Sequence, residues 1–160
     1  MGCSLFSSNA QDCSIKQAYA YQRTTIPGRR PAKTLDETGK QIEPPVKNMT
    51  TLFIYVEVGN DCIMNATGIW INEKSYHITQ EEVINLPVVI RQSHPGGAPD
   101  TLVKQTNNKV FRILAKEEWP GKKNKLKNAS AKIIIEYRNQ SKTCYYKIDN
   151  IKKLAPMVLQ

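Results

Sequence analysis

Histidines are the first side chains to consider for catalysis or metal binding, and this sequence has two, His77 and His94. His77 follows Tyr76 in a short strand-like run, which indicates a structural role. His94 begins a loop with Pro95, Gly96 and Gly97, where a site could be built. No carboxylate or second histidine stands at ligand spacing from His94, and a site of two histidines would need the fold to bring His77 and His94 together, so the sequence predicts neither a metal nor a cofactor.

Paired carboxylates occur at Glu81-Glu82 and at Glu117-Glu118. Neighbours in a strand point to opposite faces, and carboxylates at the start of a helix act as caps, so neither pair predicts a general acid–base couple. The sequence also lacks a nucleophile elbow, a phosphate-binding loop and a dinucleotide fingerprint. We therefore assign no catalytic residue. A small all-β hydrolytic enzyme remains an alternative, with a site built from the loops at 93–100 and 29–49.

The sharpest charge feature is a basic segment next to Trp119 in a chain of net charge +9. Its lysines, together with two arginines elsewhere in the chain, could form a rim that binds a polyanion. These candidate residues are Lys122, Lys123, Lys125, Lys127, Arg29 and Arg30. Solvated lysines on a hairpin loop are the alternative. Sequence-specific binding of nucleic acid is not predicted, because interleaved stacking aromatics and a recognised motif are lacking.

The cysteines indicate one disulfide. If the first ten residues are removed, Cys13, Cys62 and Cys144 remain, which in an exported protein means one bridge and one free thiol. All three pairings are open, and Cys62–Cys144 is favoured because both residues begin strands and bridges across sheets are common in sandwiches. Three reduced thiols acting as small apolar side chains are the alternative.

The N-terminus has the form of the end of an export signal. Ser8, Asn9 and Ala10 are small residues at the positions that a signal peptidase reads, which predicts cleavage between Ala10 and Gln11. This Ser-Asn-Ala-Gln ending resembles the leaders of small exported proteins of Gram-negative bacteria. We expect residues 1–10 to be a signal remnant outside the fold, and the mature protein to be periplasmic or secreted.

Three other readings of the N-terminus stay open. Gly2-Cys3 could end a lipobox, which would leave the protein anchored by a lipid on Cys3, or could belong to a myristoylation site, although Phe6 stands where a hydroxyl residue is expected. A cytoplasmic start is the third reading. No apolar run approaches the roughly 20 residues of a membrane helix, so no transmembrane segment is predicted.

The most regular stretch is Thr51–Val58, which predicts a central strand. Leu52, Ile54, Val56 and Val58 share one face, and Phe53 and Tyr55 make the other face apolar too. A strand that is apolar on both faces must be covered on both, so we expect it in the interior of a sheet.

Further strands are expected on both sides of this stretch. The first covers residues 12–22, and hairpins are expected for 62–71 with 74–78, for 101–105 with 109–116, and for 132–137 with 143–149. Thr79 and Glu82 have the form of a capping box, which predicts a helical turn to Asn85. A long polar loop is expected at 29–49 and a loosely docked tail at 153–160.

This pattern predicts one all-β domain over residues 11–152. Short strands at regular spacing favour an immunoglobulin-like β-sandwich of about seven to nine mostly antiparallel strands, with a small β-barrel as the alternative. A non-catalytic protein of the cell envelope is the function that the sequence favours. Its expected partner is an envelope protein, a glycan or a surface polymer.

Overall fold

The computed structural model describes residues 14–28, 32–43, 45, 47–91, 96–122, 131–139 and 141–159. Within these ranges all of the regular secondary structure is β, as predicted, and no helix is present. The strands are β1 (Ile15–Ile26), β2 (Thr34–Leu35), β3 (Gln41–Ile42), β4 (Met49–Val58), β5 (Asn65–Ile71), β6 (Lys74–Glu82), β7 (Val88–Ile90), β8 (Asp100–Val103), β9 (Lys109–Glu118), β10 (Ile133–Asn139), β11 (Lys142–Ile148), β12 (Lys152–Lys153) and β13 (Met157–Val158).

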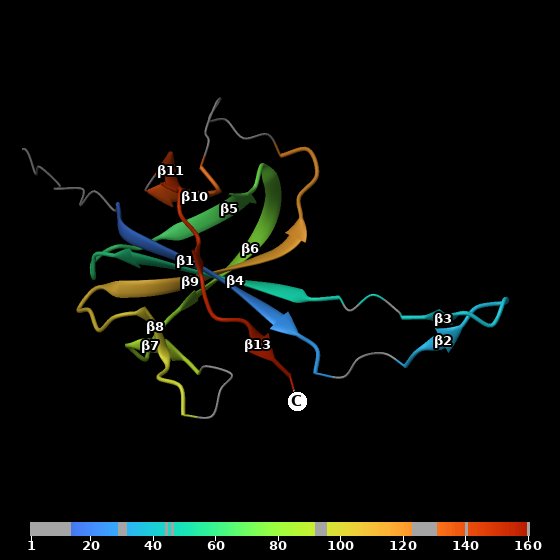
Figure 1. Cartoon of the computed structure of the whole chain (residues 1–160). Helices are drawn as coiled ribbons and strands as arrows, with labels where there is room; N and C mark the ends of the chain where they lie inside the picture. The colour runs from blue at the N-terminus through green and yellow to red at the C-terminus, as the bar shows by residue number, and fades with distance from the viewer. Residues whose placement is uncertain are drawn as a thin grey trace, which may run out of the picture.

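Nine of these strands form one large sheet, which curls into a half-barrel (Figure 1). Its order is β11-β10-β5-β6-β9-β4-β1-β12, with β13 also paired to β1. Ile148 on β11 and Ile15 on β1 pack in the same core although their strands lie near opposite ends of this order. Side chains from such distant strands can share a core only because the sheet bends around them.

Strand β4 has the predicted place in the interior of the sheet. It pairs with β1 on one side and with β9 on the other. Ile54, Val56 and Val58 lie in the main core, while Tyr55 lies in a second core on the opposite face. The prediction of a strand covered on both sides is confirmed.

The second core is covered by the small sheet of β7 and β8. Leu102 and Val103 on β8 are buried against Tyr55 and Val110, with Val88 of β7 at the margin of the same cluster. Side chains of Tyr19, Tyr21, Leu86 and Leu154 also pack on this cluster, so the small sheet and its neighbours together cover this face of β4 and β9.

The connection between β1 and β4 contains a hairpin that the sequence did not predict. Strands β2 and β3 pair only with each other within the described chain, and Figure 1 shows them projecting from the sheet. Asp36 closes the turn, because its carboxylate accepts hydrogen bonds from the backbone N–H groups of Thr38 and Lys40 at 2.9 and 2.8 Å. A further hydrogen bond from the Thr38 side chain is the largest cause of the lowered pKa of Asp36. Together with the backbone bonds it outweighs desolvation, which acts in the opposite direction.

The C-terminal segment, expected to be a tail, adds two short strands to β1. Strand β12 pairs in parallel with β1 through Tyr21 and Lys152, and β13 does so through Thr25 and Met157. The last described strands thus complete the edge of the sheet beside the first.

The predicted helical turn after Thr79 is wrong, because β6 continues to Glu82. Thr79 and Glu82 pair with β9, and the Gln80 side chain donates to the Met64 carbonyl and accepts from the Ala66 N–H, both at 2.9 Å. Hydrogen bonds along the whole strand therefore override the local capping signal.

The predicted hairpin around residues 106–108 is also wrong, since β8 pairs with β7 and β9 pairs with β4 and β6. Thr106 and Asn108 instead donate to Oε1 of Glu57 at 2.7 and 2.6 Å, and Tyr19 donates to Oε2 at 3.0 Å. Burial alone would raise the pKa of Glu57, but these bonds lower it overall. Burial and the bond to Glu57 raise the pKa of Tyr19 to about 12.

Two other predicted hairpins are confirmed. Strands β5 and β6 pair through Ile71 and Lys74, and the two residues between them, Asn72 and Glu73, have φ values of 47° and 70°. Positive φ at both positions is typical of the tight turns that suit twisted strands. Strands β10 and β11 also form a hairpin, with Asn139 opposite Lys142.

The immunoglobulin-like sandwich is not confirmed. The strands that would be divided between two packed sheets in a sandwich instead follow one continuous order, and the curled sheet is closer to the barrel alternative. Strand spacing in a sequence indicates how many strands there are but not which strands are neighbours. Among the described residues no helix exists that could cross a membrane.

Ile135 on β10 is fully buried in the main core, so Ile135→Ala should leave a cavity. We expect the free energy of unfolding to fall by about 2–5 kcal/mol, measured by urea denaturation. The matched control is Leu35→Ala on β2, where the side chain is 67% exposed and the change should stay within about 0.5 kcal/mol. Equal losses in the two variants would mean that Ile135 does not lie in the core.

Candidate functional site

The candidate site lies on the outer face of the curled sheet, over β5, β10 and β11. In β10, Ile133, Ile135 and Tyr137 point into the main core, so the alternate residues Ile134 and Glu136 point outward. Glu136 is thus a lone carboxylate on a strand whose other residues near it are apolar. Its side chain is 12% exposed, so it needs partners for its charge.

The partner cation comes from the turn that follows β9. Trp119, Pro120, Gly121 and Lys122 form a turn in which the Lys122 N–H donates to the Trp119 carbonyl at 3.4 Å and Gly121 has φ of 84°. Proline at the second position and a glycine of positive φ at the third suit a type II turn. The turn is held against β6 because the Trp119 N–H donates to the Ser75 carbonyl at 2.8 Å.

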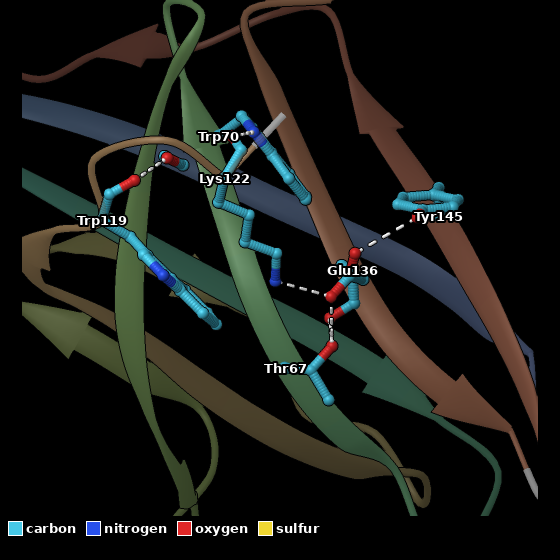
Figure 2. A network of polar contacts seen from close by, with 7 residues as sticks. Thr67, Trp70, Trp119, Lys122, Glu136 and Tyr145 are labelled. Carbon is cyan, nitrogen blue, oxygen red and sulfur yellow. Dashed lines mark hydrogen bonds and ion pairs between the residues drawn. The ribbon is translucent and has the colours of Figure 1, made fainter. Parts of the chain in front are cut away.

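Glu136 and Lys122 form a direct ion pair, shown in Figure 2. Lys122 Nζ lies 2.7 Å from Oε1 of Glu136, and the lysine side chain is only 17% exposed. Thr67 on β5 donates to the same oxygen at 2.7 Å, and the Tyr145 hydroxyl on β11 donates to Oε2 at 3.2 Å. The carboxylate on β10 is therefore held by donors from two other strands and one turn.

Both tryptophans of the chain belong to this site. The ammonium of Lys122 lies 4.2 Å from the centroid of the Trp119 ring and 5.1 Å from that of Trp70 (Figure 2). Trp70 on β5 is almost fully buried, and its indole N–H donates to the Lys122 carbonyl at 3.4 Å. A cation over an indole face is attracted by the ring quadrupole, so the rings add to the ion pair.

The electrostatics of the site favour an ionised Glu136. Burial by itself would raise the pKa of Glu136, but the hydrogen bonds from Lys122 and Thr67 and the charge of Lys122 lower it overall. Burial and the neighbouring carboxylate raise the pKa of Tyr145, which keeps this hydroxyl a donor. A carboxylate with a lowered pKa and a full set of donors is a poor proton donor, so the arrangement suits binding rather than general acid catalysis.

Gly68 on β5 makes the approach of Lys122 geometrically feasible. A Cβ at this position would lie 2.6 Å from Lys122 Nζ, which is closer than real atoms come. Beside the ion pair the surface is hollowed by about 510 Å³, with Thr67, Glu136, Arg138 and Thr143 among its walls. The site is thus a filled cation position at the edge of an open hollow.

His77, one of the two predicted candidates, lies at the margin of this site. Its ring stacks on Trp119 with 4.2 Å between centroids and 12° between planes, and within the described chain no hydrogen bond joins it to a carboxylate or hydroxyl. His94 lies outside the described residues. Among the described residues no group of three or more side chains that could hold a metal ion is found.

The basic segment is represented in the structure by Lys122 alone. The other candidate cations Lys123, Lys125, Lys127, Arg29 and Arg30 lie outside the described residues. Lys122 is not the solvated lysine expected of a loop, because its charge is neutralised by Glu136. The signal cleavage candidates Ala10 and Gln11, and Cys3, also lie outside the described residues.

The cysteines depart from the favoured pairing. Of the two cysteines in the described ranges, Cys144 on β11 is a free thiol, so the Cys62–Cys144 bridge is wrong. Cys62 is buried just before β5 and is not among the free thiols. Cys13 lies outside the described residues. Cys144 lies near the start of β11 as predicted, whereas Cys62 lies in the loop before β5.

Sequence reasoning missed Glu136, Thr67, Trp70 and Tyr145. Two signals could have found part of the site. One is a lone carboxylate in an apolar strand that follows a basic segment, and the other is the run Trp119–Lys122, whose proline and glycine predict a turn that folds the lysine back over the tryptophan. The neighbours on β5 could not be found this way, because they depend on the pairing of β5 with β10.

Comparisons with protein-family models, with curated proteins and with solved structures gave no match for this chain. Its function is therefore argued from the described geometry and the charge distribution alone.

The ion pair should make stability depend on pH. The pKa of Glu136 is lowered in the folded protein, so the pair stabilises it above the unfolded value of about pH 4.3, and this contribution is lost as the pH falls through the lowered pKa. Glu136→Gln should reduce the free energy of unfolding by about 1–3 kcal/mol at neutral pH and by much less in acid.

Urea denaturation of the wild-type and Glu136→Gln proteins at several pH values measures this difference. Glu81→Gln is the matched control, since Glu81 is exposed and forms no ion pair within the described chain. A difference between wild type and Glu136→Gln that did not change with pH would contradict an ionised, paired Glu136.

Proposed function

We propose that this chain is a non-catalytic protein of the cell envelope that binds an anionic glycan through its basic face. The basic face is defined by Lys132, Arg138 and Lys147 on and beside the outer side of the β10–β11 hairpin, with Lys142 at the turn of that hairpin. The segment 123–127, which follows the turn at Trp119–Lys122 in the sequence, contains three further lysines.

The uneven distribution of charge is the observation that carries this proposal. Residues 119–153 contain ten lysine and arginine side chains against two carboxylates, Glu136 and Asp149. Eight of the nine net positive charges of the chain thus lie in this stretch, and the remainder of the chain is nearly neutral. A field of one sign concentrated on one part of a surface attracts a polymer of the opposite sign.

The state of the individual side chains supports the same conclusion. Lys132, Arg138, Lys142 and Lys147 are exposed, and none of them takes part in an ion pair within the described ranges. Glu136, the carboxylate nearest to Arg138 along β10, is already paired with Lys122. Unpaired cations around a neutralised carboxylate leave the basic face free for an external anion.

A glycan fits this face better than a nucleic acid does. Binding of single-stranded nucleic acid relies on free aromatic faces on which bases stack. Here Trp70 is buried, Trp119 stacks on His77 and lies under Lys122, and the Tyr145 hydroxyl is bonded to Glu136. Charge is therefore the main recognition element, which suits sulfate, carboxylate or phosphate groups along a polysaccharide.

The test is retention on immobilised heparin and polygalacturonate, with neutral dextran and duplex DNA in parallel. The wild-type protein should bind both acidic glycans and elute as salt rises, since salt screens exposed charges. Arg138→Glu with Lys147→Glu should weaken binding roughly tenfold. The matched control, Lys40→Glu with Lys104→Glu, makes the same change in net charge at exposed positions outside the basic face.

Three outcomes would contradict the proposal. Equal loss in the two double variants would mean that net charge, not the basic face, drives retention. Equal retention on dextran would remove the role of the anion. Tighter retention on DNA than on either glycan would move the ligand to another class of polymer.

Export is the second part of the proposal, and it predicts an oxidised Cys62. The register places Ile15 opposite Val58, so Cys13 precedes β1 and Cys62 follows β4 at the same end of this strand pair. Cys144, the other described cysteine, is a free thiol on β11. These positions support a Cys13–Cys62 bridge in a mature chain that begins at Gln11.

Intact mass and peptide mapping of the protein from its native cells test this prediction. We expect a chain starting at Gln11 that gains two hydrogen atoms on reduction, with Cys144 open to alkylation before reduction. A chain that retains Met1, carries a lipid on Cys3 or has Cys62 as a free thiol would contradict export with this bridge.

A further inference from the structure

Lys122 occupies its site as a bound ligand would. Its ammonium contacts a carboxylate at 2.7 Å and lies over two indole rings at 4.2 and 5.1 Å. A carboxylate combined with aromatic faces is the set of groups by which proteins recognise free ammonium ligands. Lys122 reaches this set from the turn after β9, whereas Glu136 and Trp70 belong to the sheet (Figure 2).

Groups other than the Lys122 side chain also position Glu136 and Trp70. Thr67 and Tyr145 donate to the two oxygens of Glu136 at 2.7 and 3.2 Å and so orient the carboxylate. Trp70 is buried in the sheet at 2% exposure, and Tyr145 packs beside it with 6.3 Å between ring centroids. Such a preorganised site would persist if the lysine left.

We propose that Trp70, Trp119, Glu136 and Thr67 form a binding site for a primary alkylammonium group, such as a lysine side chain of a partner protein, which Lys122 fills as an internal ligand. The hollow of about 510 Å³ beside Glu136 gives an external chain access to the carboxylate. Arg138 of the basic face also lines this hollow, but the ammonium is held by Glu136, Trp70 and Trp119, so the proposal does not depend on glycan binding.

The chain length and hydrogen-bonding capacity of the ligand follow from Lys122. A linear chain of four carbons spans the distance that the lysine side chain spans, and a primary ammonium can donate to Oε1 of Glu136 while its charge lies over the rings. Gly68 marks the limit of the site, because a Cβ there would lie 2.6 Å from the ammonium position. Any ammonium ligand that replaces Lys122 must likewise fit in the space left by the missing side chain of Gly68.

The experiment removes the internal ligand and supplies an external one. Lys122→Ala is titrated with n-butylammonium and followed by tryptophan fluorescence, which reports on this site because both tryptophans of the chain lie in it. We expect saturable binding that is at least roughly tenfold tighter than in the wild-type protein, where the tethered lysine competes at high effective concentration. The melting temperature of the variant should rise with ligand concentration.

Matched controls separate recognition from a general effect of amines. Neutral n-butanol should not bind, and tetramethylammonium, which cannot donate a hydrogen bond to Glu136, should bind more weakly. Adding Glu136→Gln or Gly68→Ala to Lys122→Ala should abolish the response. Gly59→Ala is the control for the glycine change, since its Cβ would make an ordinary contact of 3.8 Å with the Lys16 side chain.

The proposal is overturned if folded Lys122→Ala gives no saturable response, if the wild type binds as tightly, or if Glu136→Gln leaves the affinity unchanged. Lys122→Gln is titrated as a second variant, because its amide can still hydrogen-bond to Glu136 and protect the fold. A rise in its melting temperature with n-butylammonium, and not with n-butanol, supports the site, and no rise counts against it.

Discussion

The structure depends on the burial of β4 on both of its faces. A strand with apolar side chains on each side cannot lie at an edge or face water, so the chain has to build a layer above it and a layer below it. The curled sheet supplies the first layer by bringing β11 and β1 around one core, and the β7–β8 pair supplies the second.

Buried carboxylates attach the irregular segments to this frame. Glu57 on β4 accepts bonds from the segment before β9, and Glu136 on β10 accepts a bond from the turn after β9. Each is placed at an outward position of a well-buried strand and is satisfied by three donors. Because a buried charge without partners is costly, each carboxylate determines where its segment must lie. The two ends of β9 are fixed in the same way.

The sequence predicted what depends on neighbouring residues in the chain. The alternation of apolar residues in Thr51–Val58 located the central strand, and the tight connection at Asn72 and Glu73 paired two strands correctly. The capping-box pattern at Thr79 did not produce a helical turn. Strand β9, which is distant in sequence, instead supplied backbone hydrogen bonds to β6 that outweighed the local signal. Only one side of the ion pair could be predicted from the sequence, since the proline and glycine of Trp119–Lys122 indicate the turn that carries the lysine. The position of Glu136 beside Thr67 depends on which strands are neighbours in the sheet. The order of strands in the sheet could not be predicted from the sequence for the same reason.

The parallel pairing of β12 and β13 with β1 has a consequence for how the protein is made. β1 is the first described strand and β12 and β13 are the last, so one edge of β1 stays unpaired while all the intervening strands are being synthesised. An unpaired edge is a template for association with other chains. The growing chain therefore carries an open edge at β1 until β12 and β13 have been synthesised.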